Sequence, residues 1–321
     1  MLVEMGIADS YGAGREYAGV EFTRKSNDLR TYRPHHKWVE LIPGNYTDDT
    51  QMAIALAELM LEHKDNLSGI TQLAWANKVV AVFKRDPHAG YAGGFYKLLQ
   101  EVGDGAELLA RITPHSHKNG GAMRAAPAGL LDDPKDVRDF AMWQASLTHA
   151  THEGMQAAAA SALLVHGCRT GVERHLLDVY LVGLLPGHQW GVPWEGRVGA
   201  PGFEAVHAAL TAIMKGNTLS NVLWECVNFT GDVDTVAAIA VAAASMHPEI
   251  PNNLHPDLYK GFETGPYGHK YLLDLDQRLY WAYLAEWDDA NIGDHLELVE
   301  EKPPEDDGDV FSLFEYDEDP K

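Results

Sequence analysis

The sequence has few cysteines and no long hydrophobic stretch, and each absence removes a class of protein. Only Cys168 and Cys226 are cysteines among 321 residues, which excludes a disulfide framework and a zinc site built from several cysteines. No window reaches the roughly 18 apolar residues of a membrane span. The first residues also lack the basic head and apolar run of a secretory signal. We therefore expect a cytoplasmic protein that makes no membrane contact.

Basic residues are scarce as well. Lysine and arginine number 25 against 47 aspartate and glutamate residues, so the formal net charge is −22. A surface this acidic repels phosphate backbones, which argues against broad nucleic-acid binding but leaves room for a local basic pocket. At 45% hydrophobic residues the chain can bury a sizeable core, so global disorder is not expected.

Helical periodicity is the main structural signal in the sequence. Apolar residues recur at spacings of three and four in several stretches, whereas alternation with a period of two is scarce. We therefore predict an all-α fold, with residues 1–295 forming a single compact helical domain. The predicted helices lie at 50–62, 73–83, 157–165, 172–185, 203–214, 236–245 and 272–286.

Residues 296–321 form a predicted acidic tail. From residue 297 onward there are eleven acidic residues against Lys302 and Lys321, which gives a charge of −9. The ordinary interpretation is a solvated tail. A docking segment for a partner is the alternative, because four hydrophobic residues interrupt the acids: Phe311, Leu313, Phe314 and Tyr316.

Two short acidic segments carry the strongest chemical signal. Each is led by a glycine and places two aspartates and a threonine before an apolar helix: Thr47, Asp48 and Asp49 in the first, and Asp232, Asp234 and Thr235 in the second. Either segment alone is explained by helix capping. If the two helix starts meet, however, four carboxylates and two hydroxyls converge, and such a cluster requires cations. Oxygen donors without histidine or cysteine favour Mg²⁺ or Mn²⁺.

Three further segments contain candidate residues, each with an ordinary alternative. Gly12 and Gly14 end a helix-like stretch and would place Glu16 on a turn, where a solvated acid is equally expected. The run 119–121, Asn-Gly-Gly, can expose backbone N–H groups to a phosphate, with Arg124 adding charge, although a plain glycine turn explains it nearly as well. His149 precedes an alanine-rich helix, where a cap or a packed residue is more common than a catalyst.

Together these segments resemble the ADP-ribosylglycohydrolase family, of the dinitrogenase-reductase-activating glycohydrolase type, in order and in spacing. The resemblance covers about residues 3–245. Its motifs read Ala8-Asp9-Ser10-Tyr11-Gly12-Ala13-Gly14-Arg15-Glu16, Thr47-Asp48-Asp49-Thr50-Gln51-Met52, Asn119 through Pro127, Thr148-His149, and Gly231 through Ile239. Any one motif is weak, but Thr-Asp-Asp followed by the late Asp-x-Asp-Thr is specific.

The resemblance implies an all-α fold with two Mg²⁺ or Mn²⁺ ions in a cleft. It assigns the ions to Thr47, Asp48, Asp49, Asp232, Asp234 and Thr235. It implies a proton-transfer role for Glu16, with Asp49 as second choice. The implied substrate-binding residues are Tyr91, Gly93, Gly94, Asn119, Gly120, Gly121, Met123, Arg124 and His149.

The activity implied is the metal-dependent hydrolysis of the glycosidic bond between ADP-ribose and a modified side chain. Arginine is the first choice for that side chain by family frequency alone, and serine linkages and small ADP-ribose conjugates are the alternatives. Arg15 departs from the family pattern beside Glu16, so we expect it to alter substrate choice. Two other functions stay open, namely an inactive ADP-ribose or nucleotide-binding regulator and a metal-dependent phosphoesterase.

Overall fold

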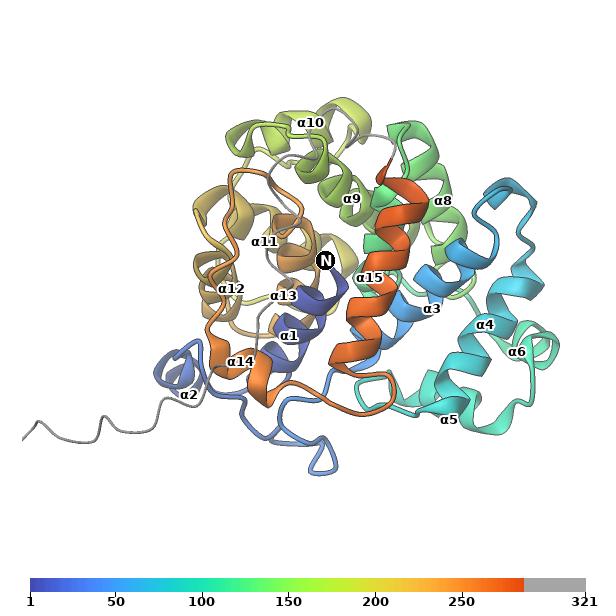
Figure 1. Ribbon diagram of the computed structural model, residues 1–321, viewed down its shortest axis with the longest axis horizontal. Coiled ribbons are helices and arrows are strands. Elements are labelled where there is room, and N and C mark those ends of the chain that lie inside the picture. Colours follow the sequence, from blue (N-terminus) through green and yellow to red (C-terminus); the bar gives the residue numbers. More distant parts are fainter. Residues whose placement is uncertain (286–321) are drawn as a thin grey trace, which may run out of the picture. The chain divides into compact units, whose positions relative to one another are not determined.

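The computed structural model describes residues 1–285, and this part of the chain consists of helices and loops without a strand (Figure 1). The predicted all-α fold is confirmed. The α-helices are α1 (Leu2–Ala13), α2 (Val20–Ser26), α3 (Asp48–Glu62), α4 (Gln72–Arg85), α5 (Gly93–Glu101), α6 (Gly105–Arg111), α7 (Gly120–Met123), α8 (Pro134–Ser146), α9 (His152–Arg169), α10 (Leu177–Leu184), α11 (Gly202–Lys215), α12 (Leu219–Asn228), α13 (Val233–Ala244), α14 (Pro256–Gly261) and α15 (His269–Tyr283).

Most predicted helices appear, and the differences have local causes. The stretch 172–185 was expected as one helix, but Gly171 adopts a positive φ of 73° and α10 begins only at Leu177, after a short 3-10 turn. Helix α8 was not predicted, because much of its length is polar or only half-buried. Helix α5 begins with Gly93 and Gly94, a pair that is typical of a loop.

The centre of the fold is the pair α1 and α13. All twelve residues of α13 are buried, as expected for a helix of small apolar residues that is surrounded by other helices. Helix α13 packs against α1, α9, α11 and α12. A Cβ atom at Gly12 would lie 2.4 Å from the Cα atom of Asp234, so only glycine permits α1 to approach the start of α13 this closely.

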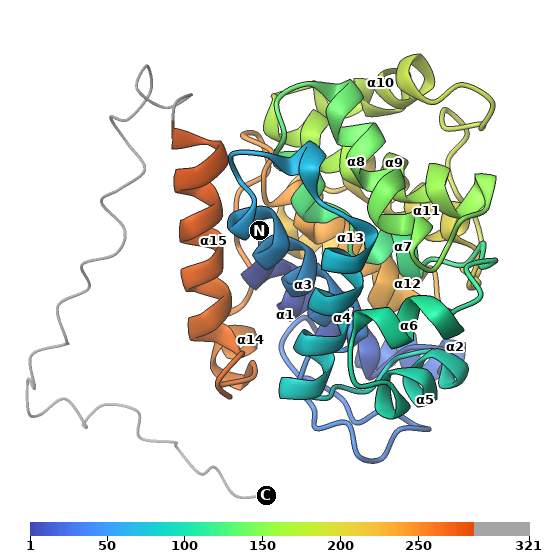
Figure 2. The same cartoon turned by 90° about the vertical axis from the view of Figure 1, so that its right-hand side faces the viewer.

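Helices α3 and α15 cover α1 on another side. Both pack against α1 and against each other, and Figure 2 shows α15 beside α3. The end of α1 and the starts of α3 and α13 are thereby brought to one region of the fold.

The described residues form one compact unit, Met1–Leu284. The domain boundary at 295 and the acidic tail 296–321 lie outside the described residues and stay predictions. Within residues 1–285, none of the helices combines the length and apolarity needed to cross a bilayer. The cytoplasmic location also stays a prediction.

Candidate active site

The start of α3 is fixed in place by Asp9 of α1. One carboxylate oxygen, Oδ2, accepts hydrogen bonds from the backbone N–H of Thr47 (2.9 Å) and from the N–H and hydroxyl of Thr50 (3.1 and 2.6 Å). The other oxygen accepts the Thr47 hydroxyl at 2.8 Å. The Thr47 side chain is also the N-cap of α3. Asp9 therefore orients the segment that carries Asp48 and Asp49.

The start of α13 is held just as closely. Gly231 has a φ of 93°, and a Cβ atom there would lie 1.9 Å from the carbonyl oxygen of Val198, so this position requires glycine. The N–H of Asp232 donates to the same carbonyl at 3.1 Å. The hydroxyl of Tyr17 donates to Asp232 Oδ2 at 3.0 Å. These contacts set the position from which Asp232 and Asp234 project.

The two helix starts meet at a cavity of about 680 Å³. Ligand sites in proteins commonly measure about 300–1,000 Å³. One carboxylate oxygen from each of Glu16, Asp232 and Asp234 lies within 4.8 Å of the others. Around the two helix starts the cavity wall carries the following acidic and hydroxyl residues: Glu16, Asp48, Asp49, Asp232, Asp234 and Thr235. Thr47 is fully buried behind them.

Burial and mutual repulsion dominate the electrostatics of this acidic centre. Burial raises the pKa of Asp48, Asp49 and Asp234 well above the ordinary aspartate value, and the charges of neighbouring carboxylates raise it further. The pKa of Asp232 rises to about 6, again first through burial and then through the charge of Glu16. Carboxylates held in this way are unfavourable without bound positive charge.

The donor atoms fit divalent cations. Asp49 Oδ1 and Asp234 Oδ1 are both buried and have no hydrogen-bond partner among the described residues. A buried carboxylate oxygen without a partner is costly unless a cation binds it. The centre offers carboxylate and hydroxyl oxygens only, which is the chemistry that Mg²⁺ and Mn²⁺ prefer.

Glu16 lies on the turn after α1, as predicted, and His35 positions it. The Nδ1 atom of His35 accepts the backbone N–H groups of Lys37 and Trp38 at 3.0 and 2.9 Å. The hydrogen of the neutral ring is therefore on Nε2, which lies 3.0 Å from Glu16 Oε2 and donates to it. The ring also stacks on Trp38, with ring centroids 4.4 Å apart. His35 thus holds Glu16 at the edge of the acidic centre.

Glycines and backbone groups form another part of the cavity wall. Cβ atoms at Gly93 and Gly94 would meet nothing within 4 Å, so these positions leave open space for a ligand. The hydroxyl of Tyr91 donates to Gln51 Oε1 at 2.6 Å, which fixes its ring. The predicted substrate-binding residues on this wall are Tyr91, Gly93, Gly94, Asn119, Gly120, Met123, Arg124 and His149. Gly121 lies behind them, against Ala145 and His149.

His149 is neutral and presents a hydrogen-bond donor. The Thr148 hydroxyl oxygen accepts from Arg124 at 2.8 Å and lies 2.6 Å from His149 Nδ1, and we assign the hydroxyl hydrogen to that nitrogen. The ring hydrogen of His149 is then on Nε2. Burial, with the nearby charge of Arg124, lowers the pKa of His149 to about 3. The imidazole can therefore donate a hydrogen bond to a ligand without carrying charge.

Two arginines have structural contacts that the sequence did not predict. Arg15 was expected to alter substrate choice, but it is fully buried and donates to the carbonyl oxygens of Tyr11, Ser26 and Thr31. Its guanidinium also lies 3.7 Å from the centre of the Tyr11 ring. Arg124 lines the cavity but is 2% exposed and donates mainly to Gln144. Burial lowers the pKa of Arg124 to about 10.

Four residues of the site were missed by sequence reasoning. Tyr17 and His35 act through contacts with residues distant in the chain, which no spacing rule reveals, whereas Asp9 lies in the first family-like motif but was given no role. The fourth is Gly90, which has a φ of 109° and would clash with Asp48 Oδ1 at 2.1 Å if it carried a Cβ atom. Its position after Pro87 and His88 was a usable signal for a tight turn.

Comparison with known proteins agrees with this fold. The family model for ADP-ribosylglycohydrolase matches residues 5–283, so the chain belongs to this family of hydrolases. It is 27% identical to human ADP-ribosylhydrolase ARH3 over 287 residues, which cover 68% of this chain and 78% of that protein.

A bacterial relative and a solved structure extend the comparison. The chain is 24% identical to the ADP-ribosyl-[dinitrogen reductase] glycohydrolase of Rhodospirillum rubrum over 245 residues, covering 74% of this chain and 80% of the relative. A structure titled ADP-ribosylglycohydrolase-related protein complex superposes with a TM-score of 0.65 at 21% identity. It covers 88% of this chain and 97% of that one, which supports the shared fold.

Proposed function

We propose that the chain is a metal-dependent hydrolase that removes ADP-ribose from a modified side chain, with ADP-ribosyl-arginine as the first candidate substrate. The observation that carries this proposal is the meeting of the α3 and α13 starts at one cavity, where Asp49 and Asp234 each keep a buried oxygen without a partner. Family membership supports the ADP-ribose part of the substrate. The choice of arginine over serine rests only on family frequency.

The proposed roles follow from position. Thr47, Asp48, Asp49, Asp232, Asp234 and Thr235 would hold two Mg²⁺ or Mn²⁺ ions. When bound, such ions supply Lewis-acid charge that orients hydroxyl oxygens and polarises water. Glu16 would act as the general acid or base, because it lies at the edge of this centre and His35 fixes its carboxylate. Asp49 is the second choice for that role.

The bond that breaks joins the anomeric carbon of ADP-ribose to the side chain. The transition state of such a cleavage is oxocarbenium-like, so negative groups near the ribose stabilise it. Water adds its oxygen to the anomeric carbon, and its proton reaches the leaving group. On the other wall, His149 would donate a hydrogen bond from Nε2, and the backbone at 119–121 would face the diphosphate. Lys118, which also lines the cavity, would add positive charge, whereas Arg111 on the same wall is paired with Glu101.

The test is the release of free ADP-ribose by the full chain from arginine-linked and serine-linked ADP-ribosyl peptides. We expect release with Mg²⁺ or Mn²⁺ that stops with a chelator. Asp234→Asn should reduce kcat at least ~100-fold, since the loss of even a second-shell partner of a metal ligand commonly costs 10–100-fold. The matched control Asp274→Asn, at a surface position with 58% of the side chain exposed, should be unchanged.

Other outcomes identify the alternatives. Tight ADP-ribose binding without turnover would indicate a binding regulator instead of an enzyme. Release of AMP or phosphate would indicate a phosphoesterase. Faster release from the serine peptide would retain the hydrolase but overturn the choice of arginine.

A further inference from the structure

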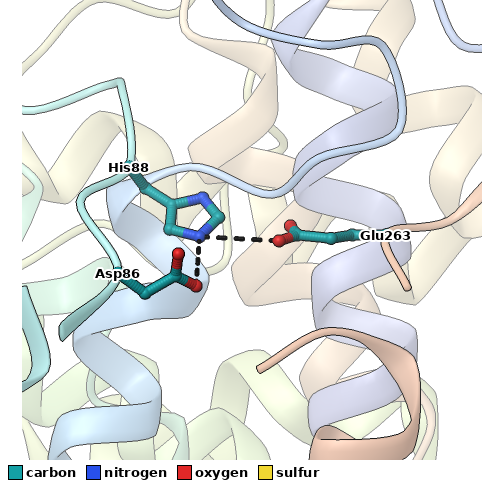
Figure 3. Close-up of side chains that lie close together, drawn as sticks. All are labelled: Asp86, His88 and Glu263. Atoms are coloured by element: carbon teal, nitrogen blue, oxygen red, sulfur yellow. Dashed lines mark hydrogen bonds and ion pairs between the residues drawn. The ribbon is translucent and has the colours of Figure 1, made fainter. Parts of the chain in front are cut away.

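A second group of metal-ligating side chains lies apart from the acidic centre. Figure 3 shows Asp86, His88 and Glu263 facing one another. Asp86 ends α4, His88 lies in the loop between α4 and α5, and Glu263 follows α14. One ligand atom of each residue lies within 4.8 Å of the other two. Segments far apart in the chain thus bring one imidazole and two carboxylates to one place.

The ring of His88 is oriented so that one nitrogen is available to a cation. Its Nδ1 atom lies 2.9 Å from the carbonyl oxygen of Tyr46, and because a carbonyl oxygen only accepts, Nδ1 carries the hydrogen. The ring also stacks on that of Tyr46, with centroids 4.1 Å apart. In the neutral ring Nε2 has a free lone pair, and it lies 3.1 Å from Asp86 Oδ2 and 3.7 Å from Glu263 Oε1. Three acceptor atoms facing one another require a proton or a metal ion between them.

The carboxylate of Glu263 is also incompletely paired. The Glu263 side chain is only 9% exposed, and its Oε2 atom is buried with no hydrogen-bond partner within residues 1–285. Such an oxygen costs stability unless a cation binds it. In the same part of the chain, Asp86 and Glu263 form ion pairs with His88 alone, and no lysine or arginine neutralises them. The two carboxylates therefore leave a charge that a divalent ion would balance.

We propose that Asp86, His88 and Glu263 bind one divalent transition-metal ion of the Zn²⁺ type. Two donors at about 2.0–2.1 Å from a zinc ion lie about 3.3 Å apart at a tetrahedral angle, close to the separations found here. An imidazole nitrogen among the ligands favours zinc over Mg²⁺ and Ca²⁺. The bond from His88 Nδ1 to a backbone carbonyl is the usual support for a ligating histidine.

The surroundings of the cluster allow an ion to enter. The three residues line a second cavity of about 440 Å³ that shares Gly90 and Tyr91 with the first, and the Asp86 side chain is 32% exposed. Three protein ligands leave a fourth position for water.

An ion here would tie the α4–α5 loop to the segment after α14. That loop supports the acidic centre, because the N–H of Asp48 donates to the carbonyl oxygen of Ala89 at 3.0 Å. The next residue, Gly90, lies directly against the Asp48 side chain. The two sites share no ligand, and an ion at Asp86, His88 and Glu263 would steady one wall of the cavity that holds the acidic centre.

The experiment measures Zn²⁺ binding to the full chain by equilibrium dialysis and metal analysis. Asp49→Asn/Asp234→Asn serves as the background, so that the acidic centre does not compete for the ion. We expect one Zn²⁺ per chain that excess Mg²⁺ does not displace. Adding His88→Gln or Glu263→Gln should weaken binding at least ~10-fold, as expected when a ligand or its support is removed. Adding His175→Gln, at a position with 73% of the side chain exposed, should leave Zn²⁺ binding unchanged.

Thermal unfolding separates binding from misfolding. Glu263→Gln is nearly isosteric, so without metal its melting temperature should match that of the background variant. Adding Zn²⁺ should raise the melting temperature of the background variant but not that of the Glu263→Gln variant. Absence of stoichiometric Zn²⁺ in the background, or its retention with both His88→Gln and Glu263→Gln, would overturn the proposal. The cluster would then be a histidine that shares a proton with two acids.

Discussion

Individual residues in this site often act through their neighbours. Asp9 collects four hydrogen bonds from Thr47 and Thr50, and His35 donates to Glu16. Neither is on the wall of the cavity, yet His35 fixes Glu16, which is, and Asp9 fixes the helix start that carries the wall residues Asp48 and Asp49. Positioning of this kind commonly matters as much as the residues that contact a ligand.

At this scale the protonation state of His149 is a direct prediction. Its pKa of about 3 means that it stays neutral across pH 5–8, and its imidazole ¹⁵N shifts should report hydrogen on Nε2 with no titration in that range. Thr148→Val removes the hydroxyl that donates to Nδ1 and should change the tautomer. An imidazole that titrates near the ordinary value of about 6.5 would contradict the account.

The same shift has a consequence for stability. Because the folded pKa lies below the unfolded one, the contribution of His149 is present above about pH 6.5 and is lost as pH falls towards 3. His149→Gln, which has nothing to protonate, should lose less unfolding free energy between pH 7 and 4. Equal losses in the two proteins would show that His149 titrates normally.

Among the helices, the contact of α1 with α13 determines the geometry of the site. Gly12→Ala would place a Cβ atom 2.4 Å from Asp234 Cα and force the helices apart. We expect a loss of about 1–3 kcal/mol in unfolding free energy, measured by urea denaturation, together with a lower kcat as Glu16 moves from Asp234. Gly19→Ala, where a Cβ atom meets nothing within 4 Å, is the control. Equal stability of the two variants would contradict the close contact.

Sequence periodicity predicted the helices that bury a continuous apolar face, such as α3, α11 and α13. It missed several others, among them α8, which is largely half-buried, α5, which opens with two glycines, and α12, which buries an apolar face but was not recognised. Motif spacing predicted the acidic segments, because their threonines and aspartates are neighbours in the chain. It could not predict the roles of Asp9 and His35 or the burial of Arg15, since each depends on contacts between distant segments.

Taken as a whole, the chain has a net charge of −22, whereas the substrate proposed for its cavity is negatively charged. In the proposed function, local groups resolve this conflict: cations at the acidic centre, backbone N–H groups, and Lys118 on the wall. The proposal gives the remaining acidity no part in catalysis. A large share of it lies in the predicted tail.

Deletion of residues 300–321 is therefore expected to leave catalysis intact. The family match ends at residue 283, and every proposed site residue precedes that point. The kcat/KM for a small ADP-ribose conjugate should be unchanged, whereas activity on a protein substrate could fall if the tail docks a partner. Loss of activity on the small conjugate would place the tail in the catalytic cavity.

The central claim is that the starts of α3 and α13 share divalent ions, and anomalous diffraction from crystals soaked in Mn²⁺ tests it most directly. The account predicts two manganese peaks bounded by Asp48, Asp49, Asp232, Asp234 and Thr235, and their loss in Asp234→Asn crystals. A cavity without manganese, or peaks bound only elsewhere on the molecule, would contradict it.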